Sequence, residues 1–151
     1  MIFELDNEKV VKLNVSMKKI VEMTKKNKGK NFKDVFFTKM NDIDFEFLAN
    51  AILGFYDKEE STVDFNGDIN KVYDFMEKYI EAKDIDYVKL YEELAEAINL
   101  KSFFGKKMSE EEMKKEMNNP LAGFDINKIV NDTAQSVMKE TVAEEFKGYK
   151  G

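Results

Sequence analysis

Residues 42–56 constrain the fold of this chain more than any other segment. The segment reads DIDFEFLANAILGFY, and its apolar residues recur at intervals of three and four, the spacing of one face of an α-helix. The main stripe comprises Phe45, Leu48, Ile52, Phe55 and Tyr56, and a second apolar flank comprises Phe47, Ala51 and Leu53. A helix that is apolar around most of its circumference is usually covered by neighbouring elements. The segment therefore predicts the central helix of a small α-rich domain.

The first fifteen residues predict a β-hairpin. Residues 2–5 and 11–15 alternate apolar and polar side chains, as half-buried strands do, and turn residues lie between them at 6–8. An isolated hairpin is only marginally stable in water. We therefore expect this hairpin to pack on the helices or to extend another sheet.

The rest of the chain is patterned mainly for helices. Ser16 is suited to cap a helix over residues 17–27, whose expected apolar face comprises Met17, Ile20, Val21 and Thr24. Residues 31–40 fit either a short helix or a strand, and we favour the helix. The predicted fold class is mainly α, with an N-terminal β-hairpin followed by a small helical bundle of about five to seven helices.

Further helices are predicted over residues 69–82, 86–98, 109–118 and 125–146. The second of these begins at a cap supplied by Asp84 or Asp86, and the third begins with a capping box in which Ser109 and Glu112 take part. Residues 64–70 alternate Asp and Asn, but the calcium-loop pattern fails, because its sixth position is Ile69 where glycine is needed.

The character of the sequence changes after residue 100. Residues 101–107 read as a hinge, and Pro120 and Gly123 bound the final helical pattern. We predict a hairpin-plus-helical core domain over residues 1–104 and a C-terminal helical extension over residues 105–151. The extension carries an apolar face and several methionines, whose flexible side chains adapt to irregular surfaces. The pattern leaves open whether it docks on its own domain or on a partner.

The composition argues against catalysis. The chain has no Cys and no His, so it lacks thiolate nucleophiles, the usual general base near neutral pH and the commonest metal ligands. It also has no glycine-rich phosphate loop. We expect no enzyme, no cofactor and no metal site. A hydrolase built on carboxylates such as Asp84 and Asp86 is a minor alternative.

All 24 basic residues are lysines, and their distribution is uneven. Residues 1–41 carry ten lysines against five acids, residues 42–100 carry five against sixteen, and residues 101–151 are balanced. Without arginine there is no bidentate fork for phosphate or guanine, so we expect no nucleic-acid partner. The acidic middle is explained by a solvated face. Its alternative is an acidic inhibitor or DNA mimic that binds a basic partner.

The sequence also bears on location and self-association. Its first residues lack a basic, then apolar, leader, and no run reaches the roughly 18 apolar residues that cross a bilayer. We expect a cytoplasmic protein without a membrane partner. The edge of the predicted hairpin could pair with a second copy, so a homo-oligomer formed through the hairpin is a further expectation.

The order of these patterns resembles that of the tail assembly chaperones of long-tailed bacteriophages and prophages. The hairpin MIFELDNEKVVKLNV runs directly into the Lys-rich segment SMKKIVEM, the Asp-capped apolar helix of residues 42–56 follows, and YEELAEAI at residues 91–98 precedes a charged extension. The resemblance covers roughly residues 1–100 and is one of layout. The hairpin turn lacks the glycine often found in that family.

The resemblance implies a non-catalytic protein of the bacterial host cytoplasm. Such chaperones keep the tape measure protein, the long helical protein that sets tail length, in solution and help to recruit tail tube protein around it. Tape measure protein exposes apolar helical stripes, so we expect contacts from the apolar face of the extension. The predicted partner-binding residues are Met113, Met117, Ile126, Ile129, Val130, Val137 and Met138.

Overall fold

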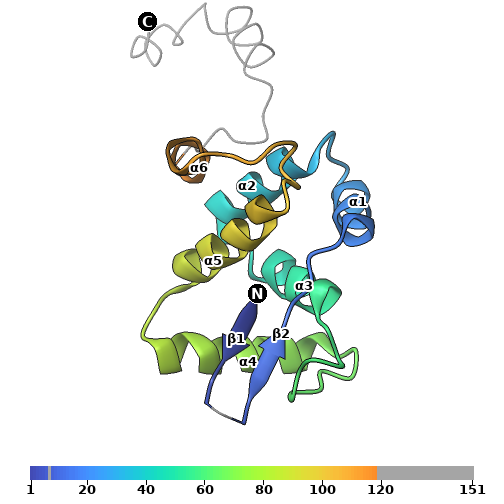
Figure 1. The fold of residues 1–151 in the computed structure, drawn as a ribbon, viewed down its shortest axis with the longest axis vertical. Helices are drawn as coiled ribbons and strands as arrows, with labels where there is room; N and C mark the ends of the chain where they lie inside the picture. The colour runs from blue at the N-terminus through green and yellow to red at the C-terminus, as the bar shows by residue number, and fades with distance from the viewer. Residues whose placement is uncertain (7, 119–151) are drawn as a thin grey trace, which may run out of the picture. The chain divides into compact units, whose positions relative to one another are not determined.

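The computed structural model describes residues 1–6 and 8–118, which belong to a compact unit bounded at Met1–Pro120. Within this part of the chain, two strands precede six helices (Figure 1). They are β1 (Ile2–Glu4), β2 (Val10–Lys12), α1 (Met17–Lys26), α2 (Phe32–Asp42), α3 (Phe45–Phe55), α4 (Ile69–Lys83), α5 (Tyr87–Leu100) and α6 (Glu110–Met117). The predicted fold class, mainly α with an N-terminal β-hairpin, is confirmed.

The hairpin is antiparallel and lies across α4, as Figure 1 shows. Phe3 pairs with Val11 in the register, and both side chains are buried. The Phe3 ring meets Tyr79 of α4 edge-on, with 4.9 Å between the ring centroids. The Asp6 carboxylate closes the turn by accepting the backbone N–H groups of Glu8 and Lys9. Packing against α4 therefore supplies the stability that a lone hairpin lacks.

The segment that fitted either a helix or a strand is the helix α2. Asn31 caps it, with its side-chain oxygen accepting the Asp34 N–H at 2.9 Å. Phe36 and Phe37 are consecutive and both fully buried, which an exposed helix would not allow. α2 is enclosed on more than one side, because the Phe36 ring also packs against those of Tyr91 and Phe104.

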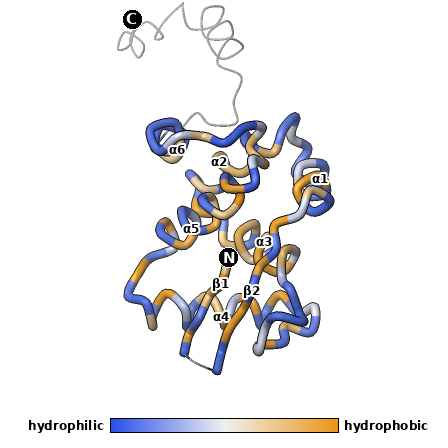
Figure 2. The backbone as a smooth tube through the Cα atoms, in the orientation of Figure 1, coloured by the Kyte–Doolittle hydropathy of each residue, from blue (hydrophilic) through white to orange (hydrophobic). Residues whose placement is uncertain are grey.

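α3 is covered by its neighbours, as predicted, and its tube is largely hydrophobic in Figure 2. Asp44 caps it by accepting the Phe47 N–H. The buried hydroxyl of Tyr91 donates to the Asp44 carbonyl at 2.5 Å and ties α5 to this helix start. Phe45 departs from the expected stripe, since 51% of its surface is exposed. It stands at the first helical position, where one side of its ring meets Tyr87 and the other meets solvent.

The expected apolar face of α1 is only partly correct. Ile20 and Met23 are buried, whereas Met17 and Val21 are 65% and 44% exposed. The helix is turned so that its buried side faces α2 and α3, and the i, i+3 pair of Ile20 and Met23 fills that contact. Met17 and Val21 are one helical turn apart and lie together on the outer side.

The segment after α5 packs back on the helical core. Phe104 is buried, and its ring stacks on Phe32 with centroids 6.0 Å apart. The Asn99 side chain makes two hydrogen bonds to the Met108 backbone, donating at 2.9 Å and accepting at 2.8 Å. α6 then contacts α2. The predicted boundary between residues 104 and 105 falls inside the compact unit, and the division into two domains stays a prediction.

Candidate functional site

A hollow that borders the exposed apolar side chain of Val21 lies along α1, and we call it the α1 groove. It has a volume of about 770 Å³, and its lining includes Val21, Thr24, Lys25, Lys30, Phe32 and Phe103. Its floor comes from three places in the sequence: the outer side of α1, the start of α2 and the segment after α5. Because Phe104 stacks on Phe32, the third segment is held against the other two.

The α1 groove combines an apolar strip with a basic rim. Val21 continues into the exposed Met17 along the outer side of α1. Lys25, Lys26 and Lys30 are exposed at the other end, and none of them forms an ion pair with another described residue. The last carbonyls of α1 account for the position of Lys25 and Lys26, since cations are favoured at a helix C-terminus. Such a surface suits an amphipathic helix whose polar flank is acidic.

The methionines predicted to bind a partner are placed differently from each other. Met113 is 5% exposed and faces the helical core, whereas Met117 is half-buried. α6 is held there by an ion pair between Lys33 Nζ and Glu116 at 3.4 Å and by a hydrogen bond from Asn41 Nδ2 to the Glu116 carbonyl at 3.3 Å. Met113 therefore acts in packing here, and a partner reaches it only if α6 moves.

The other predicted contacts, Ile126, Ile129, Val130, Val137 and Met138, lie outside the described residues. Their role therefore stays a prediction.

The start of α6 is fixed by a capping box. Ser109 Oγ accepts the Glu112 N–H at 3.2 Å, and Glu112 accepts the Ser109 N–H at 2.9 Å. Lys106 Nζ donates to the same carboxylate at 2.6 Å. This hydrogen bond to Lys106, together with that from Ser109, lowers the pKa of Glu112 from 4.5 to about 2.

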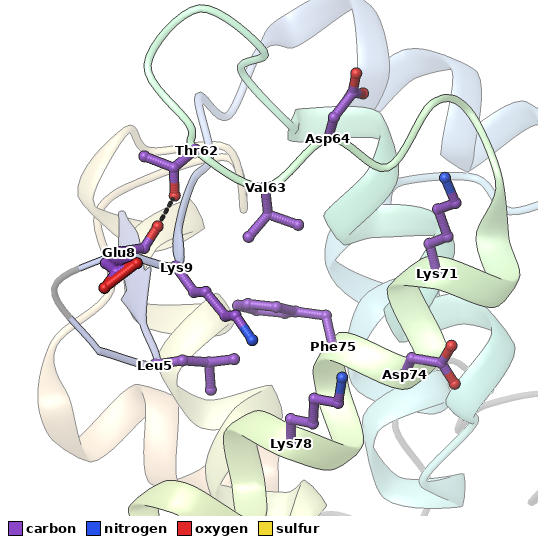
Figure 3. Close-up of a pocket in the computed structure, with 10 residues that line it drawn as sticks. All are labelled: Leu5, Glu8, Lys9, Thr62, Val63, Asp64, Lys71, Asp74, Phe75 and Lys78. Atoms are coloured by element: carbon purple, nitrogen blue, oxygen red, sulfur yellow. Dashed lines mark hydrogen bonds between the residues drawn. The ribbon is translucent and has the colours of Figure 1, made fainter.

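A second hollow of about 500 Å³ lies between the hairpin and α4 (Figure 3). Lys9 lies beside the Phe75 ring and Lys78 below it in this view. The charged residues that line the hollow are Lys9, Lys71, Lys78, Glu8, Asp64 and Asp74. Positive and negative side chains are equal in number there. The hollow therefore offers neither a cation site nor an anion site.

Two of the tyrosines whose pKa is raised, Tyr79 and Tyr91, belong to the core. Burial raises the pKa of Tyr91 far above its ordinary range. Burial, helped by the hydrogen bond from the Tyr79 hydroxyl to Glu93, raises the pKa of Tyr79 to about 12. Both hydroxyls stay protonated at neutral pH and act as structural donors.

Asp84 and Asp86, the carboxylates considered for a hydrolase, both lie at helix ends. Asp86 caps α5 by accepting the Lys89 N–H at 2.9 Å, whereas Asp84 ends α4 in the left-handed region with φ of 55°. Both side chains are exposed. Among residues 1–6 and 8–118, no three acidic side chains gather in a way that could hold a metal ion.

Comparison with known proteins gives no match to a family model, to a curated protein or to a solved structure. Within the described part of the chain, every helix is too short or too polar to cross a membrane.

Sequence reasoning missed the α1 groove. It assigned Met17 and Val21 to the core side of α1. The available signal was Met23, which forms an apolar i, i+3 pair with Ile20 and competes with Val21 for the buried side.

Proposed function

We propose that this protein is a non-catalytic assembly chaperone of the bacteriophage tail, which binds tape measure protein and keeps it in solution. The observation that carries the proposal is the α1 groove, where the exposed Val21 lies beside Lys25 and Lys30, which form no ion pair with another described residue. A long helical protein with apolar stripes aggregates when those stripes meet water. An apolar groove with a charged rim can cover one stripe and leave the complex soluble.

The proposed chaperone binds by helix-in-groove packing and changes no covalent bond. Val21 and Met17 cover apolar residues of the tape measure helix, while Lys25 and Lys30 face acids on its flank. The predicted contacts in residues 119–151 would extend the same surface chemistry, and recruitment of tail tube protein would follow once the tape measure is held. The layout resemblance over residues 1–100 names this partner class.

The test is co-expression of the full chain with a tape measure fragment that is insoluble alone. We expect the chain to move the fragment into the soluble fraction and Val21→Glu to lower that yield several-fold, because a carboxylate would face the apolar strip and acidic flank. Val88→Glu is the matched control: Val88 is 40% exposed, close to the 44% of Val21, but lies on α5 outside the groove. Equal yields from the two variants would exclude the groove as the binding surface.

The acidic middle of the chain supports a second candidate, an acidic inhibitor or DNA mimic. Asp74, Glu77 and Glu81 are all exposed along α4, and the net charge of residues 42–100 is −11. Binding through exposed charge weakens steeply as salt rises, whereas packing in an apolar groove changes little. Capture of tape measure fragment that survives high salt would favour the chaperone. Capture of a basic partner that is lost with added salt would favour the inhibitor.

A further inference from the structure

The two outer edges of the hairpin differ in how their backbone groups are satisfied. On β2, the residues that face away from β1 are Val10 and Lys12. Thr62 Oγ1 accepts the Val10 N–H and Ser61 Oγ accepts the Lys12 N–H, both at 2.8 Å. Their carbonyls accept backbone N–H groups of Thr62 and Asp57 at 2.9 Å. The loop after α3 therefore closes this edge completely.

The outer edge of β1 is open. The backbone bonds from Leu5 to Lys9 and from Leu13 to Met1 place the odd-numbered residues of β1 in the hydrogen-bonded pairs. Ile2 and Glu4 then direct their N–H and C=O groups away from β2. No group among the described residues bonds to these two donors and two acceptors. Exposed edges of this kind are templates for another strand.

The surface beside this edge is apolar. Ile2 is 56% exposed and Leu100 is 68% exposed, and both line a hollow of about 510 Å³ between β1 and the end of α5. An added strand would therefore find side-chain contacts as well as backbone partners.

We propose that the open edge of β1 pairs with β1 of a second copy of this chain, forming a two-fold dimer with a four-stranded antiparallel sheet. One register satisfies all four outward groups of each copy: Ile2 opposite Glu4 of the second copy, with the two-fold axis at Phe3. Each Ile2–Glu4 pair exchanges two backbone hydrogen bonds. A two-fold contact of one strand with itself is a closed interface and leaves no free edge for further growth.

Charge selects this register and this occupant. Shifting the strands so that Glu4 meets Glu4 would oppose two carboxylates, which is unfavourable. In the proposed register, Glu4 of the second copy lies in one cross-strand row with Ile2 and its partner Lys12. Lys12 is only weakly engaged, 3.9 Å from a largely exposed Glu60. The ammonium group can therefore turn towards the arriving carboxylate.

The first experiment measures the mass of the full chain in solution over a range of concentrations. We expect the apparent mass to double with rising concentration for the natural chain and for Glu4→Ala, which keeps the backbone N–H. Glu4→Pro removes an N–H that the hairpin does not use, and proline is tolerated at such edge positions. This variant should stay monomeric. A natural chain that remains monomeric, or a Glu4→Pro chain that still doubles, would overturn the proposal.

The second experiment leaves the backbone intact and reports the register. The chain has no cysteine, so Ile2→Cys and Glu4→Cys each introduce a single thiol. In the proposed register these two positions of different copies have Cα atoms about 5.5 Å apart, within the range that a disulfide spans. Mild oxidation of the mixed variants should give several-fold more cross-linked dimer than either variant alone. Equal cross-linking in all three samples would contradict the register.

The dimer does not depend on the proposed chaperone function. It uses β1, whereas the co-expression test alters α1, so either proposal can fail while the other holds.

Discussion

At the residue scale, Asp84 and Asp86 lie two positions apart in the chain but have different structural roles. Asp86 starts α5 with a side-chain hydrogen bond, whereas Asp84 ends α4 in a backbone conformation that favours glycine. Sequence alone gave both the same role, a cap for α5. The difference lies in φ, which only the fold determines.

We expect the two positions to respond with opposite signs. Asp86→Ala should lower the free energy of unfolding by about 1 kcal/mol, because it leaves the first N–H groups of α5 without that acceptor. Asp84→Gly should raise it by roughly 0.5 kcal/mol, because the Cβ penalty of the left-handed region exceeds the added entropy of glycine in the unfolded chain. Urea unfolding of the two variants beside the natural chain measures both. Destabilisation by Asp84→Gly would refute the second part.

Glu112 gives a prediction about pH. Its folded pKa of about 2 is below its ordinary value of 4.5, so its contribution to the start of α6 is complete above pH 4.5. The contribution is lost as pH falls from about 4.5 towards about 2. A carboxyl NMR titration should show the low midpoint.

Two lysine variants test the cause of the lowered pKa of Glu112. Lys106→Gln should move the Glu112 midpoint upwards, because the hydrogen bond from Lys106 is its largest cause. Lys107→Gln removes the neighbouring charge, which has no ion pair with Glu112, and should leave the midpoint nearly unchanged. Equal shifts from both variants would mean that general charge, and not the hydrogen bond, sets the pKa.

At the element scale, α6 is attached to the core by its one buried side chain, Met113, together with the polar contacts of Glu116 with Lys33 and Asn41. Met113→Ala should loosen α6 and lower the free energy of unfolding by about 2 kcal/mol, the lower end of the range for truncating a buried large apolar residue to alanine, because a short helix can relax into the space. Met117→Ala, at a half-buried position, should cost less than half as much. Hydrogen exchange of the backbone amides of α6 measures how far each variant loosens the helix. Similar protection in the two variants would show that Met113 does not anchor the helix.

Elements were more predictable than their orientation. The caps Ser16, Asp44 and Ser109 mark helix starts because a short polar side chain there bonds to the chain's own backbone, a local effect. The outward rotation of α1 was not predictable, since it depends on which of Val21 and Met23 finds partners on α2 and α3. The α1 groove is also lined by Phe103, which is far from α1 in the sequence. The periodicity of apolar residues does not predict contacts between segments that are distant in the chain.

At the scale of the whole molecule, the described core is closed within residues 1–118. Its buried side chains come from every described element, including Met113 of α6. We expect a chain shortened to residues 1–120 to unfold in one cooperative transition at nearly the temperature of the full chain. Shortening to residues 1–104 should lower that temperature markedly, because Met108 and Met113 are removed from the core. Calorimetry of the full chain and of the two shortened chains measures these unfolding temperatures.

The same shortened chain tests the predicted contacts in residues 119–151. If Ile126, Ile129, Val130, Val137 and Met138 bind tape measure protein, residues 1–120 should hold less of a co-expressed fragment in solution than the full chain does. If the α1 groove suffices, the two yields should be equal. Equal yields would remove the C-terminal residues from the proposed binding surface and leave the groove.

The closure of β2 by Ser61 and Thr62 has a consequence for the order of events during synthesis. Val10 bonds to Thr62, 52 residues later in the chain, and Lys12 bonds to Ser61, 49 residues later. Contacts of such sequence separation form late, because a long loop must close first. The outer edge of β2 therefore stays without these partners until residues 61 and 62 have been synthesised and the intervening loop has closed. Factors that shield exposed strands in newly made chains would have their main opportunity in that interval.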